Sequence, residues 1–232
     1  MQNLTANHVD SVDESIDQLF LWHTFDVRSL LPFGWQEKLL GLVTQRARAK
    51  SLTPTSITSR ESEDVKEISV LTVGGRVLAQ EALWLVHLYE TSFRSLGERA
   101  IGERLFTAKD ERVKVNLNLQ SGNTMRYEAH VGSNPLEGLL YVTDHSSETD
   151  GELVVAQRPD AVGVEDIDKD AAILYPTAGH LVLFDARRYP HYVCPLRSPD
   201  MARAVATMTY YTADSPETHR PADLNMHLFG EA

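Results

Sequence analysis

The chain has 232 residues, of which 42% are apolar, and it carries a formal net charge of −11. This length suits a single domain with one core, and all-β barrels of this size are commonly undivided. The acidic balance argues against nucleic-acid polymers and anionic membranes as partners, because both attract positively charged surfaces. We therefore expect a small-molecule partner.

Cys194 is the only cysteine, so the chain cannot form an intramolecular disulfide bond. The sequence shows no basic-then-apolar export signal and no apolar run long enough to span a membrane. These features predict a cytoplasmic protein. Cys194 itself is predicted to be a small buried residue rather than a nucleophile.

The first hundred residues predict mainly helices. A capping-box spacing over 11–14 precedes apolar residues at helical spacing and predicts a helix of about three turns. A weaker helix is predicted over 33–43, and the polar segment 51–64 has the composition of an exposed loop. A strand over 67–73 precedes a helix over 82–96, whose apolar stripe should pack on a sheet.

Short strands dominate the rest of the chain. Residues 113–119 alternate strictly between apolar and polar side chains, and a turn at 121–123 leads into a strand over 125–131. Further strand-like runs cover 138–143, 152–157, 171–174, 180–184, 192–196 and 204–211. Their regular spacing predicts an antiparallel barrel or jelly roll flanked by the N-terminal helices. The segment after 212 is irregular, and it could form a lid, a dimer contact or a disordered tail.

Two histidines lie at the ends of strand-like runs. His130 comes near the end of the run 125–131, and His191 directly precedes the run 192–196. Two histidines and one carboxylate are the ligands with which many non-haem Fe(II) enzymes activate O₂. In this chain, however, the residue two positions after His130 is Gly132, where a carboxylate would make chemical sense.

The surroundings of the two histidines carry a family resemblance. The segment Thr-Asp-Gly-Glu-Leu-Val at 149–154 matches a Gly-Gly-Glu-Leu-like turn, and Pro-Thr-Ala-Gly-His-Leu-Val-Leu-Phe-Asp at 176–185 precedes His191. With His130-Val-Gly132 in the place of a His-x-Asp/Glu motif, the chain resembles the 2-oxoglutarate/Fe(II)-dependent oxygenase superfamily over roughly 113–212. The resemblance implies one domain over 1–232, with a helical part over about 1–105 and a cupin-like double-stranded β-helix core over about 113–212.

The resemblance also implies cofactors and their ligands. His130 and His191 would bind Fe(II), Arg203 would pair with the distal carboxylate of 2-oxoglutarate, and O₂ would be the co-substrate. A guanidinium group suits this role because it can bind a carboxylate with two parallel hydrogen bonds. Arg197 is the alternative partner, but it lies in a turn between prolines whereas Arg203 opens a strand.

Gly132 has no side chain that could bind a metal. Among the relatives, His-x-Gly resembles the radical halogenases, in which chloride or bromide binds the metal where the carboxylate is missing. The resemblance therefore implies that Gly132 makes room for a halide and that a ferryl radical mechanism chlorinates an unactivated C–H bond. Ser133 and Asn134 are candidates for hydrogen bonds to the halide.

Two other functions remain open from the sequence. One is a 2-oxoglutarate-dependent hydroxylase, natural or an Asp-to-Gly variant, with water in place of the halide. The other is a non-catalytic jelly roll that binds a ligand, in which Gly132 is only a turn residue.

Several polar residues are candidates for substrate binding. Strand alternation places Arg126 on the same face as His130, so Arg126 could bind a substrate anion or form an internal salt bridge. Asn116 and Asn118 share a strand face and could bind a ligand or face solvent. Arg188 lies at the predicted barrel mouth, where it could meet an anionic group or stay solvated.

The substrate class follows from the resemblance only in part. Related carrier-independent halogenases act on free small molecules, whereas others need a substrate tethered to a carrier protein. The acidic charge of this chain disfavours docking of an acidic carrier protein. We therefore expect a free substrate of amino acid or nucleotide type, and the oligomeric state stays open.

Overall fold

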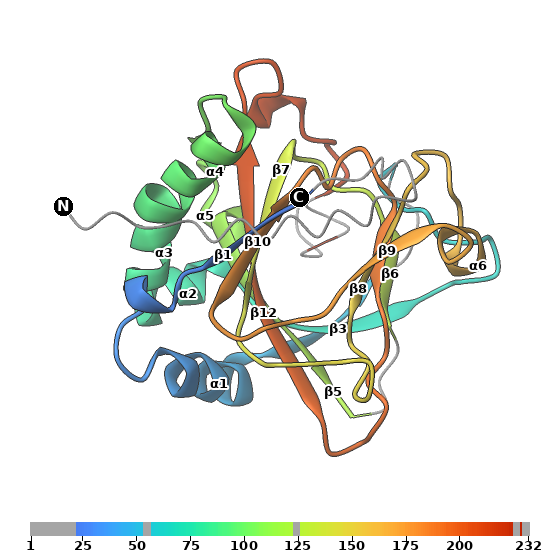
Figure 1. Ribbon diagram of the computed structural model, residues 1–232, viewed down its shortest axis with the longest axis horizontal. Coiled ribbons are helices and arrows are strands. Elements are labelled where there is room, and N and C mark those ends of the chain that lie inside the picture. The colour runs from blue at the N-terminus through green and yellow to red at the C-terminus, as the bar shows by residue number, and fades with distance from the viewer. Residues whose placement is uncertain (1–21, 53–56, 123–125, 225–227, 229–232) are drawn as a thin grey trace.

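The computed structural model describes residues 22–52, 57–122, 126–224 and 228, and every structural statement below concerns these residues. Two antiparallel β-sheets face each other (Figure 1). The larger sheet contains, in spatial order, β1 (Trp22–Asp26), β10 (His180–Phe184), β7 (Leu136–Tyr141), β12 (Ala202–Tyr211), β5 (Val115–Ser121), β3 (Ile68–Val73) and β2 (Arg48–Leu52), and β4 (Phe106–Thr107) also pairs with β12. The smaller sheet contains, in spatial order, β6 (Tyr127–His130), β11 (His191–Val193), β8 (Leu153–Ala156) and β9 (Ala171–Leu174). The prediction of a mainly β jelly roll, or double-stranded β-helix, is confirmed.

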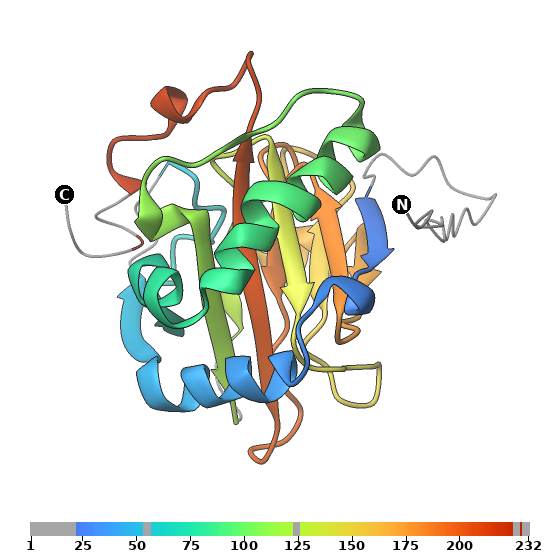
Figure 2. The ribbon, with the colours of Figure 1, turned by 90° about the vertical axis from the view of Figure 1, so that its left-hand side faces the viewer.

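Helices cover one face of the larger sheet, as Figure 2 shows. They are α1 (Trp35–Arg46), α2 (Gly75–Glu81), α3 (Leu83–Leu88), the π-helix η2 (Tyr89–Phe93) and α4 (Arg94–Ile101). Single helical turns occur at η1 (Arg28–Leu30), α5 (Glu111–Lys114), α6 (Val164–Ile167) and η3 (Glu217–His219). Leu85, Tyr89 and Phe93 repeat every four residues and are fully buried, so the predicted apolar stripe does pack on the sheet. The Tyr89 hydroxyl also donates a 2.6 Å hydrogen bond to the carbonyl of Thr209 on β12.

The structure tests the predictions for the N-terminal part only in part. The helix expected after 11–14 lies outside the described residues except for its last apolar residue, Trp22, which opens strand β1 instead. Strand β1 pairs along the whole of β10 and so occupies an edge of the larger sheet. The expected loop over 51–64 includes the end of β2 and the buried Thr58. The N-terminal part therefore adds strands to the larger sheet as well as helices.

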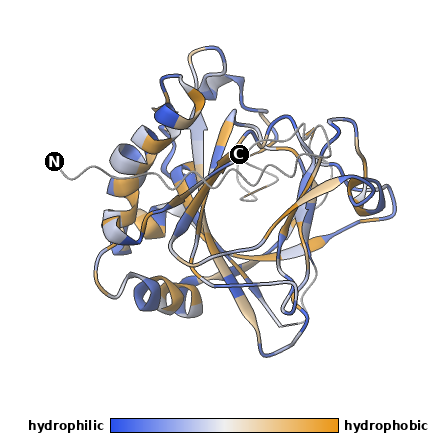
Figure 3. Cartoon of the chain, viewed as in Figure 1, coloured by the Kyte–Doolittle hydropathy of each residue, from blue (hydrophilic) through white to orange (hydrophobic). Residues whose placement is uncertain are grey.

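Strand β12 separates two environments because its residues alternate between the faces of the sheet. Ala204, Ala206, Met208 and Tyr210 face the helices and belong to the largest apolar cluster of the molecule. Arg203, Val205, Thr207 and Thr209 face the smaller sheet and line a cavity. Figure 3 shows the corresponding distribution, with apolar residues along the strands and polar residues in many of the connecting loops. No helix in the described ranges is long and apolar enough to cross a membrane.

Candidate active site

A cavity of about 160 Å³ lies between the two sheets. By the same measure one water molecule needs roughly 10–15 Å³, so the cavity has room for a small molecule. Its walls include the predicted site residues His130, Gly132, His191 and Arg203, as well as both asparagines of β5. The fold therefore brings together residues that are far apart in the sequence.

His130 and His191 are direct partners across the pairing of β6 and β11. Their ring centroids are 4.4 Å apart, with an angle of 55° between the ring planes. Phe184 meets His191 edge-on at 5.3 Å, and Tyr127 lies 5.7 Å from His130, so aromatic neighbours restrict both rings. The two imidazoles are thus held side by side at one wall of the cavity.

The tautomer of each histidine follows from its hydrogen bond. Nδ1 of His130 lies 2.8 Å from the carbonyl oxygen of Glu128, and Nδ1 of His191 lies 2.9 Å from that of Tyr189. A carbonyl oxygen only accepts hydrogen bonds, so in both rings Nδ1 carries the proton and Nε2 keeps its lone pair. This arrangement, in which a backbone carbonyl orients the ring, is the one that metal-binding histidines use.

His191 is also electrically suited to bind a metal. Its side chain is 3% exposed, and burial together with the neighbouring His130 lowers its pKa to about 3. The ring is therefore neutral at pH 7, which is the form that donates a lone pair to a metal ion.

The described part of the chain places no third metal ligand beside the histidines. Among the described residues, no group of three His, Cys, Asp or Glu side chains is placed to hold a metal ion. Gly132 itself packs tightly: its amide donates a 2.7 Å hydrogen bond to the carbonyl of Ala186, and an added Cβ would lie 2.8 Å from the Cβ of Ala186. Such a distance is too short for two carbon atoms, so the local packing favours glycine at this position.

Arg203 is a buried cation that forms no salt bridge within the described residues, although Glu152 is near enough to interact with it electrostatically. Its side chain is 3% exposed, its Nη1 lies 3.5 Å from Oε1 of Gln120, and its guanidinium carbon is 5.5 Å from the ring of Tyr141. Within the described part of the chain, its Nε has no hydrogen-bond partner and no carboxylate forms a salt bridge with it. Burial lowers the pKa of Arg203. A buried positive charge is costly without a counter-ion, so this position is suited to an anionic ligand.

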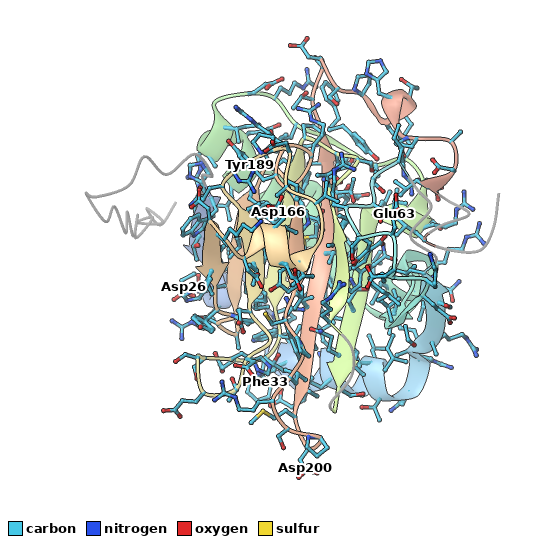
Figure 4. All side chains as sticks on the ribbon, turned by 90° about the vertical axis from the view of Figure 1, so that its right-hand side faces the viewer. Asp26, Phe33, Glu63, Asp166, Tyr189 and Asp200 are labelled. Atoms are coloured by element: carbon cyan, nitrogen blue, oxygen red, sulfur yellow. The ribbon has the colours of Figure 1, made fainter. Side chains whose placement is uncertain are left out.

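Arg203 and Thr209 lie toward opposite ends of the cavity-facing side of β12. Figure 4 labels Tyr189 and Asp200, which lie far apart in the molecule. Along β12, Arg203 pairs with Gln120 at one end, whereas Thr209 pairs with Glu137 at the other. With a rise of about 3.3 Å per residue, Arg203 and Thr209 are roughly 20 Å apart along the strand.

The remaining predicted residues fall into two groups. Asn116 and Asn118 line the cavity, and Asn118 accepts a 2.9 Å hydrogen bond from the Thr72 hydroxyl. Arg126 and Arg188 do not line it. Arg126 instead forms the internal salt bridge, with two 2.6 Å hydrogen bonds to Glu61.

Three further residues considered in the sequence, Arg188, Arg197 and Cys194, lie outside the cavity wall. Arg188 is exposed and lies 5.3 Å from the ring of Tyr189. Arg197 pairs with Asp150 at 2.7 Å on the surface, away from the cavity, which leaves Arg203 as the candidate anion-binding arginine. Burial raises the pKa of the Cys194 thiol to about 12, so it is not an activated nucleophile.

Lys50, Glu137 and Arg220 are charged residues of the cavity wall that were not predicted from the sequence. Glu137 is the charged residue in the otherwise apolar strand β7, and that inward charge was a usable signal. Arg220 follows η3 in the irregular C-terminal segment, where no sequence pattern indicated its position. All three line the same cavity as the histidines.

No protein-family model and no curated protein matches the sequence. Solved structures do match in fold. SnoN, a non-haem α-ketoglutarate-dependent epimerase of nogalamycin biosynthesis, has a TM-score of 0.55 at 16% identity, covering 83% of this chain and 78% of SnoN. A 2OG-Fe(II) oxygenase-family oxidoreductase from Burkholderia pseudomallei has a TM-score of 0.58 at 10% identity, covering 86% and 89%. HygX from Streptomyces hygroscopicus, solved with nickel and 2-oxoglutarate bound, has a TM-score of 0.55 at 10% identity, covering 83% of each chain.

The chain has the fold of the Fe(II)/2-oxoglutarate-dependent oxygenases. The residues of its cavity also fit the two groups that this fold implies. The free Nε2 atoms of His130 and His191 suit a metal ion, and the unpaired buried guanidinium of Arg203 suits a carboxylate of 2-oxoglutarate.

Proposed function

We propose that the protein is an Fe(II)/2-oxoglutarate-dependent halogenase that acts on a free small molecule. The observation that carries this proposal is the cavity wall with two oriented histidines and, among the described residues, no acidic side chain placed to complete a metal site with them. The tight contact between Gly132 and Ala186 supports it further, because the local packing there favours a residue without a side chain.

His130 and His191 would hold the metal through Nε2, with their rings kept in place by the carbonyls of Glu128 and Tyr189. Arg203 would bind one carboxylate of 2-oxoglutarate and thereby direct the other toward the histidines. Iron with 2-oxoglutarate and O₂ supplies the oxidising power to remove hydrogen from an unactivated C–H bond. Gly132 would leave space beside the metal for chloride or bromide, which the substrate gains in place of hydrogen.

The apolar residues between Arg203 and the histidines would limit the access of water. Val205 and Leu139 line this stretch, on neighbouring strands of the larger sheet, and Val193 lines it on the smaller sheet. Exclusion of water strengthens the pairing of Arg203 with a carboxylate. It also protects a reactive substrate from capture by solvent.

The experiment that tests the proposal is product analysis by mass spectrometry. The protein is supplied with Fe(II), 2-oxoglutarate, O₂ and chloride, together with panels of free amino acids and nucleotides. We expect succinate and a product with the chlorine isotope pattern, which shifts to the bromine pattern when bromide replaces chloride. A product that gains only oxygen, regardless of halide, would identify a hydroxylase instead.

Two variants serve as controls. His191→Ala should abolish both succinate and product, because one of the two metal ligands is lost. Arg99→Gln removes an exposed charge on α4, far from the cavity wall, and should leave both unchanged. If no succinate forms with any substrate and iron does not bind, the chain is a non-catalytic jelly roll.

A further inference from the structure

The charged residues of the cavity wall that have no part in binding a metal or 2-oxoglutarate are Lys50, Glu128, Glu137 and Arg220. Glu137 lies on β7, and Arg220 lies beyond the end of β12 in the C-terminal segment. Neither is involved in a side-chain hydrogen bond or salt bridge within the described ranges. Opposite charges that face a common cavity without being paired to each other indicate a ligand that carries both charges.

Glu137 has no charged neighbour across its own strand pairs. Its cross-strand neighbours are Phe184 on β10 and Thr209 on β12, neither of which carries a charge. The hydroxyl of Tyr127 interacts with it electrostatically, and Lys50 lines the same cavity. Burial raises the pKa of Glu137 to about 7. A bound cation would favour the charged carboxylate.

Further hydrogen-bond acceptors lie close to Glu137. Oδ1 of Asn116 is buried and has no hydrogen-bond partner in the described structure. Asn116 pairs with Thr207, the residue of β12 that faces the cavity next to Thr209, while Glu137 pairs with Thr209. The cavity wall thus offers a carboxylate and an amide oxygen on the two strands that flank β12. A group with several N–H donors and a positive charge, such as an ammonium group, matches this wall.

Arg220 provides the complementary charge. Its Nη2 is buried and lacks a hydrogen-bond partner among the described residues. The acids nearest to it are already engaged: Asp110 binds Arg112 through both carboxylate oxygens, and Glu217 accepts hydrogen bonds from the backbone amides of Lys109 and Asp110. The Arg220 guanidinium is therefore free to bind a ligand carboxylate.

The cavity wall also includes apolar residues. Among them are Leu52, Val70, Val113 and Leu224. Apolar walls favour a ligand with an aliphatic portion. They also suit a substrate whose reacting C–H bond is unactivated.

We propose that the substrate is a free amino acid with an aliphatic side chain, with its carboxylate bound by Arg220 and its ammonium group bound by Glu137 and Asn116. This inference rests on the proposed function only for the reaction that follows binding. A nucleotide fits less well, because its phosphate would match Arg220 but it brings no cation to Glu137.

The test is binding of defined probes to the full chain, loaded anaerobically with Fe(II) and 2-oxoglutarate. Thermal shift is measured with the twenty proteinogenic L-amino acids and with adenosine monophosphate, and calorimetry then gives Kd for the best binder. We expect an aliphatic amino acid to bind, and its N-acetyl and carboxamide derivatives to bind at least about tenfold more weakly, the loss of one charge-assisted contact.

Variants of Glu137 and Arg220 test which group of the amino acid each residue binds. Glu137→Gln should remove the preference for the free amine over the N-acetyl derivative, and Arg220→Gln should remove the preference for the free acid over the carboxamide. Arg220→Lys should keep part of the latter preference, which separates loss of charge from loss of folding. Glu103→Gln and Arg99→Gln remove exposed charges outside the cavity and should change neither preference.

The outcomes separate this inference from the proposed function. Tight binding of adenosine monophosphate that Glu137→Gln does not affect would overturn the amino acid inference, as would a failure of every amino acid to bind while 2-oxoglutarate still binds. Charge-dependent amino acid binding followed by hydroxylation alone would uphold the inference and overturn the halogenase.

Discussion

The backbone amide of Gly132 donates a 2.7 Å hydrogen bond to the carbonyl of Ala186, and a Cβ added to Gly132 would lie only 2.8 Å from the Cβ of Ala186. The contact joins the loop after β6 to the loop before β11, the two strands that carry the histidines. Position 132 therefore lacks a carboxylate, and Ala186 also packs so closely that a Cβ at this position would be crowded.

Introduction of a carboxylate tests this contact. Gly132→Asp should destabilise the protein by about 1–3 kcal/mol, the usual cost of overpacking, because the backbone at Ala186 must move. The double variant Gly132→Asp with Ala186→Gly should recover most of this loss in chemical denaturation. It should also halogenate less than the parent and hydroxylate the substrate instead. Equal stability of the single and double variants would show that the contact does not restrict position 132.

Arg203 should govern the binding of 2-oxoglutarate. Arg203→Gln should raise the Kd for 2-oxoglutarate at least about thirtyfold, since truncating one partner of a buried charge pair costs about 2 kcal/mol or more. Arg197→Gln is the matched control, because Arg197 pairs with Asp150 on the surface. Calorimetry under anaerobic conditions measures both. A stronger effect of the Arg197 variant would show that Arg197, and not Arg203, binds 2-oxoglutarate.

Glu137 should make stability depend on pH. Its pKa is about 7 in the folded protein against an ordinary value of 4.5, so the folded state holds its proton more tightly. Stability from this group is therefore present at low pH and decreases as the pH rises from about 4.5 to 7. Glu137→Gln should match the parent at pH 4 and be more stable by on the order of 2 kcal/mol at pH 8. A gain that is the same at both pH values would contradict this.

Arg126 should matter for stability rather than for substrate binding. Its partner Glu61 has a side chain that is only 1% exposed and also accepts a hydrogen bond from the amide of Ala129. Arg126→Gln should therefore cost about 3 kcal/mol in urea unfolding, because a buried carboxylate loses its counter-ion. The affinities for 2-oxoglutarate and for an amino acid should be retained. Loss of amino acid binding with unchanged stability would show that Arg126 binds the substrate.

Much of the core was predictable because strands have a characteristic pattern in the local sequence. Alternation in 113–119 and the apolar runs before His191 predicted β5 and β10, and the histidines at the strand ends predicted which residues would meet. Arg203 was preferred over Arg197 because it opens a strand, and it alone of the two lines the cavity.

What escaped prediction depends on contacts between distant parts of the chain. No sequence pattern predicted the strand Trp22–Asp26, which forms by pairing with the edge of β10. The pairing of Arg126 with Glu61 requires a segment that looked like a solvated loop, and Arg220 reaches the cavity from an irregular tail. Such positions are decided by tertiary structure, which local periodicity does not encode.

The most direct test of the central claim is a chloride titration of the protein loaded anaerobically with Fe(II) and 2-oxoglutarate. The visible absorption spectrum is measured at each chloride concentration. If a halide binds beside His130 and His191 where Gly132 leaves space, the spectrum should shift with saturable chloride dependence, and the shift should be lost in the Gly132→Asp, Ala186→Gly double variant. A spectrum that saturating chloride does not change, in a protein that binds iron and 2-oxoglutarate, would contradict the account.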